Sequence, residues 1–170
     1  MSLKNLFSFP ITVFLFIQIL VLVNPVASQN KTGLAPFHGK VIKIVDGDTY
    51  DALTSDYKTI RIRMNGIDAP EKKQAFGQKS KDYLGGLCFG KTVLIKPHSF
   101  DRNKRLIADT YTPDNKDLSR EMVRSGYAWH FKKYSKDKIL ADDENHARSK
   151  KAGLWIDNEP IAPWEFRSKR

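Results

Sequence analysis

The clearest hydrophobic pattern in the chain lies at residues 58–64. Ile60, Ile62 and Met64 share one face of this segment, and Arg61 and Arg63 share the other. Side chains alternate between the two faces of a β-strand, so this spacing is typical of a strand buried on one side only. We expect the apolar side to face inward and both arginines to face solvent.

Four further strands are predicted by short runs rich in β-branched residues, bounded by turn residues, at 41–45, 50–53, 92–96 and 105–111. Asp46-Gly47 separates the first two runs and predicts a hairpin turn. Pro97 follows the fourth predicted strand and is expected to end it, because proline has no N–H for the sheet.

Longer segments with helical spacing lie between and after these strands. We expect helices at about 74–87, from Asp117 or Ser119 to Arg124, and at about 138–151. Gly126 and Gly153 are expected to end the second and third helices. The tail from residue 160 onward contains Pro163-Trp164, which we expect to pack back onto the domain.

The order of these elements is three strands, a helix, two strands and two helices. Five short strands with a helix between the third and the fourth follow the order of an OB-fold. The predicted fold is therefore α+β with a mainly β core, an OB-fold five-stranded barrel with three helices. One domain, at 38–167, is expected to hold all of these elements after a flexible lead-in at 29–37.

Residues 1–28 have the pattern of a secretory signal peptide. An apolar run at 11–23 follows Lys4, and Val26-Ala27-Ser28 places small residues before a cleavage point at Gln29. The apolar run is shorter than the ~20 residues of a membrane span, although 3–9 could lengthen it into an uncleaved anchor. The prediction is an exported protein, secreted or periplasmic, with no stable membrane association once the signal is removed.

Charge and cysteine content narrow the class of partner. The chain has 170 residues and a net charge of +10, which suggests polyanionic partners such as nucleic acid but also fits a generically soluble basic protein. Cys88 is the only cysteine, so no disulfide can form within the chain. Its apolar neighbours predict a small buried residue rather than a reactive thiol.

Two carboxylates lie at predicted strand ends. Asp48 follows the first hairpin turn and Asp68 follows the third strand, so a small barrel can bring them together. Facing carboxylates repel unless a cation lies between them, and hard oxygen ligands suit Ca²⁺. The alternative is that both aspartates simply favour turns. The acidic residues from Asp46 onward do not have the spacing of an EF-hand calcium loop, and the four histidines do not have the spacing of a zinc site.

Acidic and basic groups beside these aspartates fit phosphate chemistry. Glu71 could take a proton from an attacking water, or it could complement the dipole of a helix start. Arg61 and Arg63 form one basic group, and 102–105 holds another. The planar guanidinium matches phosphate oxygens, although surface arginines are commonly just solvated.

Several ordered motifs resemble the staphylococcal-nuclease-like (thermonuclease) family. They cover about 38–167 and comprise VDGDT at 45–49, IRMNGIDAPE at 62–71, QAFG at 74–77, the 101–105 segment, LSREMVRSGYAWH at 118–130, YSKD at 134–137, GLW at 153–155 and PWEFR at 163–167. The resemblance implies an OB-fold nuclease that is Ca²⁺-dependent, cleaves DNA and RNA and leaves 3′-phosphate ends. A monomer is expected.

The resemblance also implies roles for individual residues. Asp48 and Asp68 would be carboxylate ligands of Ca²⁺, and the Ala69 carbonyl would be a backbone ligand. Glu71 would be the general base. Arg63 would bind the phosphate, and Arg105 would stabilise the transition state. Arg61 is out of register with the phosphate-binding arginine of the family motif.

The chain departs from the family pattern at two places. Asn103-Lys104 replaces the usual Tyr-Gly before the second arginine, and Asn is expected to tolerate the left-handed backbone there. Lys132 stands at a family tyrosine position and would favour phosphate contact, while Tyr134 is kept. The alternative function is an OB-fold module that binds nucleic acid without cutting it; a structural protein with a basic face is a weaker rival.

Overall fold

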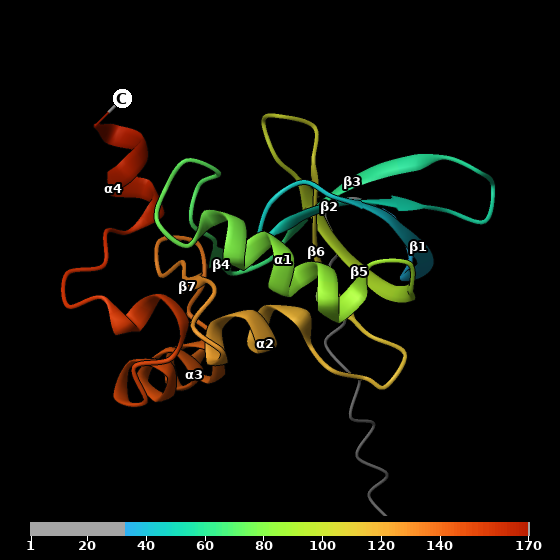
Figure 1. The fold of residues 1–170 in the computed structure, drawn as a ribbon. Helices are drawn as coiled ribbons and strands as arrows, with labels where there is room; N and C mark the ends of the chain where they lie inside the picture. The colour runs from blue at the N-terminus through green and yellow to red at the C-terminus, as the bar shows by residue number, and fades with distance from the viewer. Residues whose placement is uncertain (1–32, 170) are drawn as a thin grey trace, which may run out of the picture.

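The computed structural model describes residues 33–169, so the predicted signal peptide and residues 29–32 of the lead-in lie outside the described residues. Five strands close into a barrel in the order β1-β2-β3-β6-β5. They are β1 (Phe37–Ile44), β2 (Thr49–Leu53), β3 (Thr59–Met64), β5 (Thr92–Phe100) and β6 (Leu106–Tyr111). The predicted α+β OB-fold barrel is confirmed, with all five predicted strands present (Figure 1).

The barrel closes through one parallel pair. β1 and β2 form the predicted antiparallel hairpin, and β3 pairs antiparallel with β2. β3 then pairs with β6 in parallel, placing Ile62 beside Leu106 and Arg63 beside Ile107. The parallel contact brings together two segments far apart in sequence. β3 carries Arg63, and Arg105 immediately precedes β6.

The expected end of the fourth strand at Pro97 is wrong. β5 continues to Phe100, and its register with β6 shifts between Pro97 and Ser99. Pairing with β1 ends at Ile95, so beyond that residue only β6 borders the strand. An irregular register beside a free strand edge accommodates a residue that lacks an N–H.

The core follows the alternation seen in the sequence. Ile62 and Met64 are buried inside the barrel, together with apolar residues of the other strands, Val41, Val93, Ile95, Leu106 and Ala108. Cys88 lies fully buried in the same core, and burial raises the pKa of its thiol to about 12. The prediction of an unreactive, apolar role for this cysteine is confirmed.

Helices cover one side and one end of the barrel. They are α1 (Gly77–Cys88), α2 (Leu118–Arg124), α3 (Lys138–Ser149), the 3₁₀ helix η1 (Gly153–Ile156) and α4 (Pro163–Ser168). Asp117 caps α2 by accepting a hydrogen bond from the Arg120 N–H, as one of the two predicted caps. Gly126 follows α2 with a φ of 73°. The described residues include no helix long and apolar enough to cross a membrane.

The first helix begins later than predicted. Phe76 has a left-handed backbone with a φ of 64°, so the helix cannot extend back to residue 74. A Cβ on Gly77 would lie 2.0 Å from the Glu71 carbonyl oxygen, so only glycine permits this close approach. The 71–76 loop is therefore folded tightly against the helix start.

A second, two-stranded sheet lies outside the barrel. β4 (Ile67–Asp68) pairs antiparallel with β7 (Trp129–His130), which fixes Asp68 opposite Trp129. The predicted packing of the tail is confirmed. The Trp164 ring stacks on Phe131 at a centroid distance of 5.1 Å, and it meets Trp129 edge-on at 5.6 Å. The tail also forms the short helix α4, which the sequence pattern did not predict.

Candidate active site

The hairpin turn between β1 and β2 meets the segment after β4 through Asp48. Its Oδ2 accepts a hydrogen bond of 2.7 Å from the Ala69 N–H, and its Oδ1 accepts one of 2.8 Å from the Thr49 hydroxyl. Asp48, Asp68 and Ala69 are all buried. The structure therefore brings together the three residues predicted to hold a cation.

Arg63 lies between the two aspartates. Its Nη2 donates to Asp68 Oδ1 at 2.9 Å, and its Nη1 lies 3.1 Å from Asp48 Oδ2. Nη1 also donates to the Ile67 carbonyl at 2.8 Å. The side chain is only 13% exposed. The expectation that both β3 arginines face solvent is wrong for Arg63, because buried carboxylates and a carbonyl surround its guanidinium.

Arg61 differs from Arg63 in its partner and its exposure. It makes a bidentate ion pair with Asp51 on the neighbouring strand, with distances of 2.8 and 3.0 Å. Nearly half of its side chain is exposed. The structure thus separates Arg61 from the aspartate pair that Arg63 joins.

A third carboxylate, missed by the sequence analysis, borders the site. Asp46 accepts a hydrogen bond of 3.1 Å from the Asp48 N–H. Burial, with a further contribution from the adjacent Asp48 carboxyl, raises the pKa of Asp46 to about 7. We had interpreted Asp46 only as half of a turn dipeptide. The available signal was its spacing, two residues before Asp48 on the same turn.

Glu71 lies at the exposed edge of the site and contacts a residue that the sequence analysis did not assign. Its Oε1 accepts a hydrogen bond of 2.7 Å from Nη1 of Arg167, on α4. Arg167 also donates to both oxygens of Asp68, at 2.7 and 3.2 Å. The motif at 163–167 was the only signal, and it carried no role. Figure 1 shows α4, in red, beside the green loop that carries Glu71.

Opposing effects act on the pKa of the Asp68 carboxyl. Burial raises its pKa above the ordinary value, the hydrogen bond from Arg167 lowers it, and the nearby Asp48 raises it. The net direction is upward. Because a buried carboxylate needs nearby positive charge, Arg63 and Arg167 both favour its ionised form.

Arg105 lies just before β6, the strand that pairs with β3, and has its own partner. Its Nε donates to Asp101 Oδ2 at 2.7 Å, and its N–H donates to Asp101 Oδ1 at 2.9 Å. The strand register puts Leu106 beside Ile62, so Arg105 and Arg63 lie on the same outer face of the barrel. Within residues 33–169, no ion pair joins Arg105 to the central carboxylates.

The two departures from the family pattern are also placed. Lys104, rather than Asn103, adopts the left-handed backbone, with a φ of 61°. That corrects the expectation that Asn103 takes the conformation of the family glycine. Lys132 forms an ion pair of 2.7 Å with the buried Glu144, so its ammonium is already engaged by a carboxylate. Tyr134 is largely exposed and meets Phe131 edge-on at 4.9 Å.

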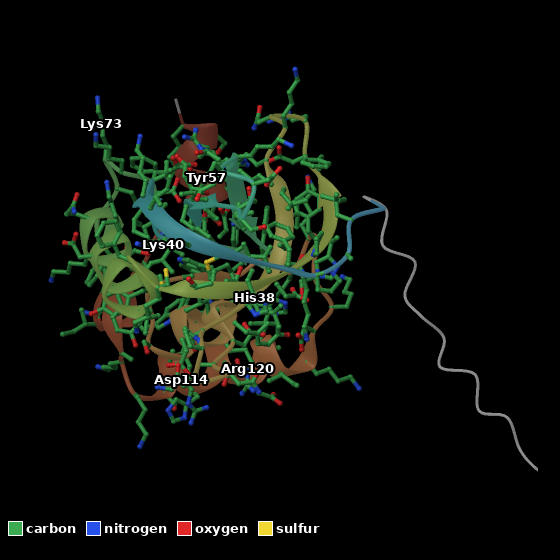
Figure 2. The ribbon with its side chains drawn as sticks, turned by 90° about the vertical axis from the view of Figure 1, so that its right-hand side faces the viewer. His38, Lys40, Tyr57, Lys73, Asp114 and Arg120 are labelled. Atoms are coloured by element: carbon green, nitrogen blue, oxygen red, sulfur yellow. The ribbon has the colours of Figure 1, made fainter. Side chains whose placement is uncertain are left out.

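Basic side chains gather beside the Glu71 loop. An open cavity of about 500 Å³ is lined by 72–76, Gln78 and Lys79, with the Lys79 ammonium 5.0 Å from the centre of the Phe76 ring. Lys72 and Lys73 are exposed, and Figure 2 shows Lys73 at the outer edge of the molecule. This surface can attract a polyanion to the carboxylate site.

The family model described as "Staphylococcal nuclease homologue" matches residues 61–157 of the chain. An "Uncharacterized endonuclease" from Escherichia coli is 41% identical over 136 residues, covering 80% of this chain and 88% of the relative. The chain belongs to the staphylococcal nuclease homologue family. It is a nuclease, and nucleic acid is its substrate.

Other relatives of this nuclease bear related names. An "Uncharacterized endonuclease" from Haemophilus influenzae is 44% identical over 128 residues, covering 75% of this chain and 71% of the relative. A "Micrococcal nuclease" from Shigella flexneri is 36% identical over 143 residues, covering 78% of this chain and 82% of the relative. The family match includes Arg63, Asp68, Glu71 and Arg105, whereas Asp48 and Arg167 lie outside it.

The donor chemistry of this nuclease suits a hard cation. Asp48, Asp68 and the Ala69 carbonyl offer oxygen atoms within one hydrogen-bonded unit, and oxygen ligands are those that Ca²⁺ prefers. Residues 33–169 contain no group of three or more His, Cys, Asp or Glu side chains arranged to hold a metal ion. The predicted set is smaller, with two carboxylates and one carbonyl, and water would complete the shell.

Proposed function

We propose that this nuclease is a Ca²⁺-dependent endonuclease that hydrolyses phosphodiester bonds of both DNA and RNA and leaves 3′-phosphate ends. The convergence of Asp48, Asp68 and Arg63, with Glu71 joined to Asp68 through Arg167, carries the proposal. A phosphodiester needs acidic groups for a cation and for an attacking water, and basic groups for its own oxygens. This corner supplies both kinds.

The general base in this mechanism is Glu71. Its carboxylate takes a proton from a water molecule, whose oxygen attacks phosphorus in line with the 5′-oxygen. The new bond joins the water oxygen to phosphorus, and the bond from phosphorus to the 5′-oxygen breaks. The departing oxygen takes a proton from solvent and leaves as a 5′-hydroxyl, while the phosphate remains on the 3′ side. Partial exposure of Glu71 gives water access to it.

Arginines stabilise the negative charge that builds on the phosphate. Arg63 lies within the carboxylate pair, and Arg105 lies just before the neighbouring strand β6, with its Nε held by Asp101. Preorganised guanidinium groups at such a position lower the barrier because they need no reorientation during the reaction. Arg61 is assigned no role, since it is out of register with the family motif and its carboxylate partner is Asp51 rather than Asp48 or Asp68.

Asp48, Asp68 and the Ala69 carbonyl would hold the Ca²⁺ ion. When bound, the ion would supply positive charge to the phosphate oxygens and make the attacking water more acidic. Occupation by a divalent cation would also relieve the repulsion between the two buried aspartates.

Substrate binding is proposed to depend on the phosphate backbone rather than on base sequence. The net charge of +10 and the exposed Lys72 and Lys73 beside the site favour any nucleic-acid strand. We further propose export through the 1–28 signal, action outside the cytoplasm without stable membrane association, and a monomeric state.

The test uses purified residues 29–170 with single-stranded DNA and, separately, single-stranded RNA. Cleavage of both in Ca²⁺, none in EGTA, and products that gain a 3′-hydroxyl only after phosphatase treatment would support the proposal. Equal activity in Ca²⁺ and EGTA would refute the metal assignment. Tight binding with no cleavage in Ca²⁺ would favour the non-catalytic binding module.

Glu71→Gln tests the base separately from the metal. The variant should cleave about 10²- to 10⁴-fold more slowly, because the general base is lost while the shape is retained. Glu165→Gln is the matched control, since Glu165 is an exposed carboxylate on α4. Comparable rates for Glu71→Gln and the control would remove Glu71 from the mechanism.

A further inference from the structure

The C-terminal helix α4 reaches the site through Arg167, whose guanidinium makes three contacts with two acidic residues. Nη2 donates to Asp68 Oδ2 at 2.7 Å, and Nη1 donates to Asp68 Oδ1 at 3.2 Å and to Glu71 Oε1 at 2.7 Å. One nitrogen therefore bridges an oxygen of each carboxylate. This is a more specific arrangement than a single surface ion pair, because the planar fork fixes both acceptors.

The positive charge of Arg167 offsets the repulsion between the Asp68 and Glu71 carboxylates. Asp68 and Glu71 are three positions apart, with Pro70 restricting the backbone between them. Two carboxylates this close repel each other, and, among the described acidic residues, Arg63 contacts only Asp48 and Asp68. Arg167 is the one described cation that forms a salt bridge with Glu71.

A second link, made by different atoms, joins the same loop to the C-terminal segment. The Gln74 side chain donates from Nε2 to the Ile161 carbonyl at 2.6 Å. Its Oε1 accepts from the Glu71 N–H at 3.0 Å, and its own N–H donates to the Glu71 carbonyl at 2.8 Å. The C-terminal segment thus holds Glu71 by its backbone as well as by its side chain.

Aromatic contacts anchor α4 to the segment that pairs with β4. Trp164 stacks almost parallel on Phe131, with an interplanar angle of 6°, and meets Trp129 edge-on. Trp129 in turn lies opposite Asp68 in the pairing of β7 with β4. The helix that carries Arg167 is therefore built onto the same small sheet that carries Asp68.

We propose that Arg167 is a positioning residue of the nuclease, which holds the Glu71 carboxylate in place beside Asp68 for proton abstraction. The inference rests on the role of Glu71 in the proposed function. It adds α4 to the active site, beyond the segment matched by the family. Arg167 acts through Glu71 and Asp68 and need not touch the reacting phosphate.

The kinetic test compares Arg167→Ala and Arg167→Lys with Lys169→Ala, an exposed lysine two residues further on. Arg167→Ala should lower kcat by about 100-fold and change KM by less than about threefold, because geometry rather than substrate affinity is lost. Arg167→Lys should recover only a small part of the loss, since an ammonium cannot bridge three oxygens as a fork. Lys169→Ala should match the wild type.

Chemical rescue distinguishes positioning from general damage to the fold. Guanidinium chloride at ~20 mM should raise the kcat of Arg167→Ala severalfold, and the same concentration of NaCl should not, because only guanidinium restores the fork. Equal responses to both salts would overturn the proposal. So would an Arg167→Ala rate within about twofold of the wild type, or a faster one, which would make Arg167 an inhibitory contact.

A measurement without substrate keeps the inference separate from the proposed activity. Amide hydrogen exchange of the 69–78 peptide in EGTA should be faster in Arg167→Ala than in the wild type and in Lys169→Ala. Unchanged exchange would overturn the proposal even if the wild type were active. Faster exchange in an enzyme that fails to cleave would uphold the tether and refute only the proposed function.

Discussion

Asp48 accepts a hydrogen bond from the backbone N–H of Ala69, 21 positions further along the chain, at 2.7 Å. The same oxygen faces Arg63, and the other oxygen accepts from Thr49. Asp48 thus joins the first hairpin turn to the segment that carries Asp68 and Glu71. Asp48, which is proposed to bind a cation, therefore also stabilises the fold by joining these two segments.

Replacing Asp48 by alanine should therefore affect stability as well as activity. Asp48→Ala leaves a buried N–H without its acceptor, which costs about 1–3 kcal/mol in the free energy of unfolding. Asp48→Asn keeps one side-chain oxygen and should lose less. Urea unfolding followed by tryptophan fluorescence measures both. Asp56→Ala, at an exposed ion pair with Lys58, is the control and should leave the urea midpoint unchanged.

The two arginines of β3 provide a matched pair. Arg63→Ala should reduce kcat by about 10²-fold or more, because it removes preorganised charge from the carboxylate centre. Arg61→Ala removes the same charge from the same strand but breaks only the pair with Asp51, which lies away from the two central aspartates. Its rate should stay within about threefold of the wild type. Similar losses for the two variants would show that general charge, rather than the position of Arg63, controls the rate.

Lys104 occupies a backbone conformation that glycine adopts more easily, with a φ of 61°. Lys104→Gly should raise the free energy of unfolding by ~0.5–1 kcal/mol, because relief of the left-handed conformation exceeds the added freedom of the unfolded chain. Lys104→Ala loses the same side chain and keeps the strain, so it should not be stabilising. Thermal melting of both variants decides the matter.

His130 gives the fold a sensitivity to acid. The imidazole is almost fully buried, and neither ring nitrogen has a hydrogen-bond partner among the described residues. Burial lowers its pKa below the ordinary value; the nearby Glu144 and Asp137 oppose this shift, and Lys132 adds to it. The unfolded chain therefore binds the proton more readily, and the contribution of His130 to stability is lost as pH falls below about 6.5.

A buried phenylalanine at this position cannot titrate. Between pH 7 and pH 5, the free energy of unfolding of His130→Phe should fall less steeply than that of the wild type. His38→Phe is the control, because His38 is exposed on β1 (Figure 2) and should leave the slope unchanged. Equal slopes for the wild type and His130→Phe would contradict the assignment.

The lysines next to Glu71 should contribute to substrate affinity through phosphate contacts. Lys72 and Lys73 are replaced by glutamine, and the binding constant for single-stranded DNA is measured at several salt concentrations. The slope of the logarithm of this constant against the logarithm of the salt concentration should become shallower by about 0.7 for each lost contact. The loss should be similar for different DNA sequences. Replacing Lys58 and Lys116, which pair with Asp56 and Asp114, gives a control of equal charge.

Local patterns were enough to predict most of the barrel. The strict alternation at 58–64 correctly placed Ile62 and Met64 inside, and the Asp-Gly turn correctly placed the first hairpin. Pro97 was misjudged because a single strand pattern cannot show where its neighbour stops. α4 was missed because six residues give too little periodicity for a helix, and its stability depends on Trp164 packing on Phe131.

The site was predicted less completely than the fold. Asp48, Asp68, Ala69 and Arg63 converge, Glu71 is joined to them through Arg167, and Arg105 pairs with Asp101 instead; the roles of all of them stay predictions. Asp46 was missed because a turn dipeptide gives no sign that its carboxylate is buried, although its spacing from Asp48 was visible. Arg167 was missed because it meets Glu71 across 96 positions, and no local spacing encodes such a contact. The exposure of Arg63 was misjudged because alternation shows which face a side chain occupies but not what covers that face.

The parallel pairing of β3 with β6 has a consequence for the stage of folding at which the enzyme becomes active. The segments that carry Arg63 and Arg105 come together only when these strands, joined by a long crossover containing β4, α1 and β5, close the barrel. Contacts between distant segments form late, because the intervening chain must first be ordered. A chain still emerging or held unfolded would lack long-range contacts such as that of Arg167 with Asp68 and Glu71, and would leave nucleic acid uncut. Onset of cleavage would then mark completion of folding itself.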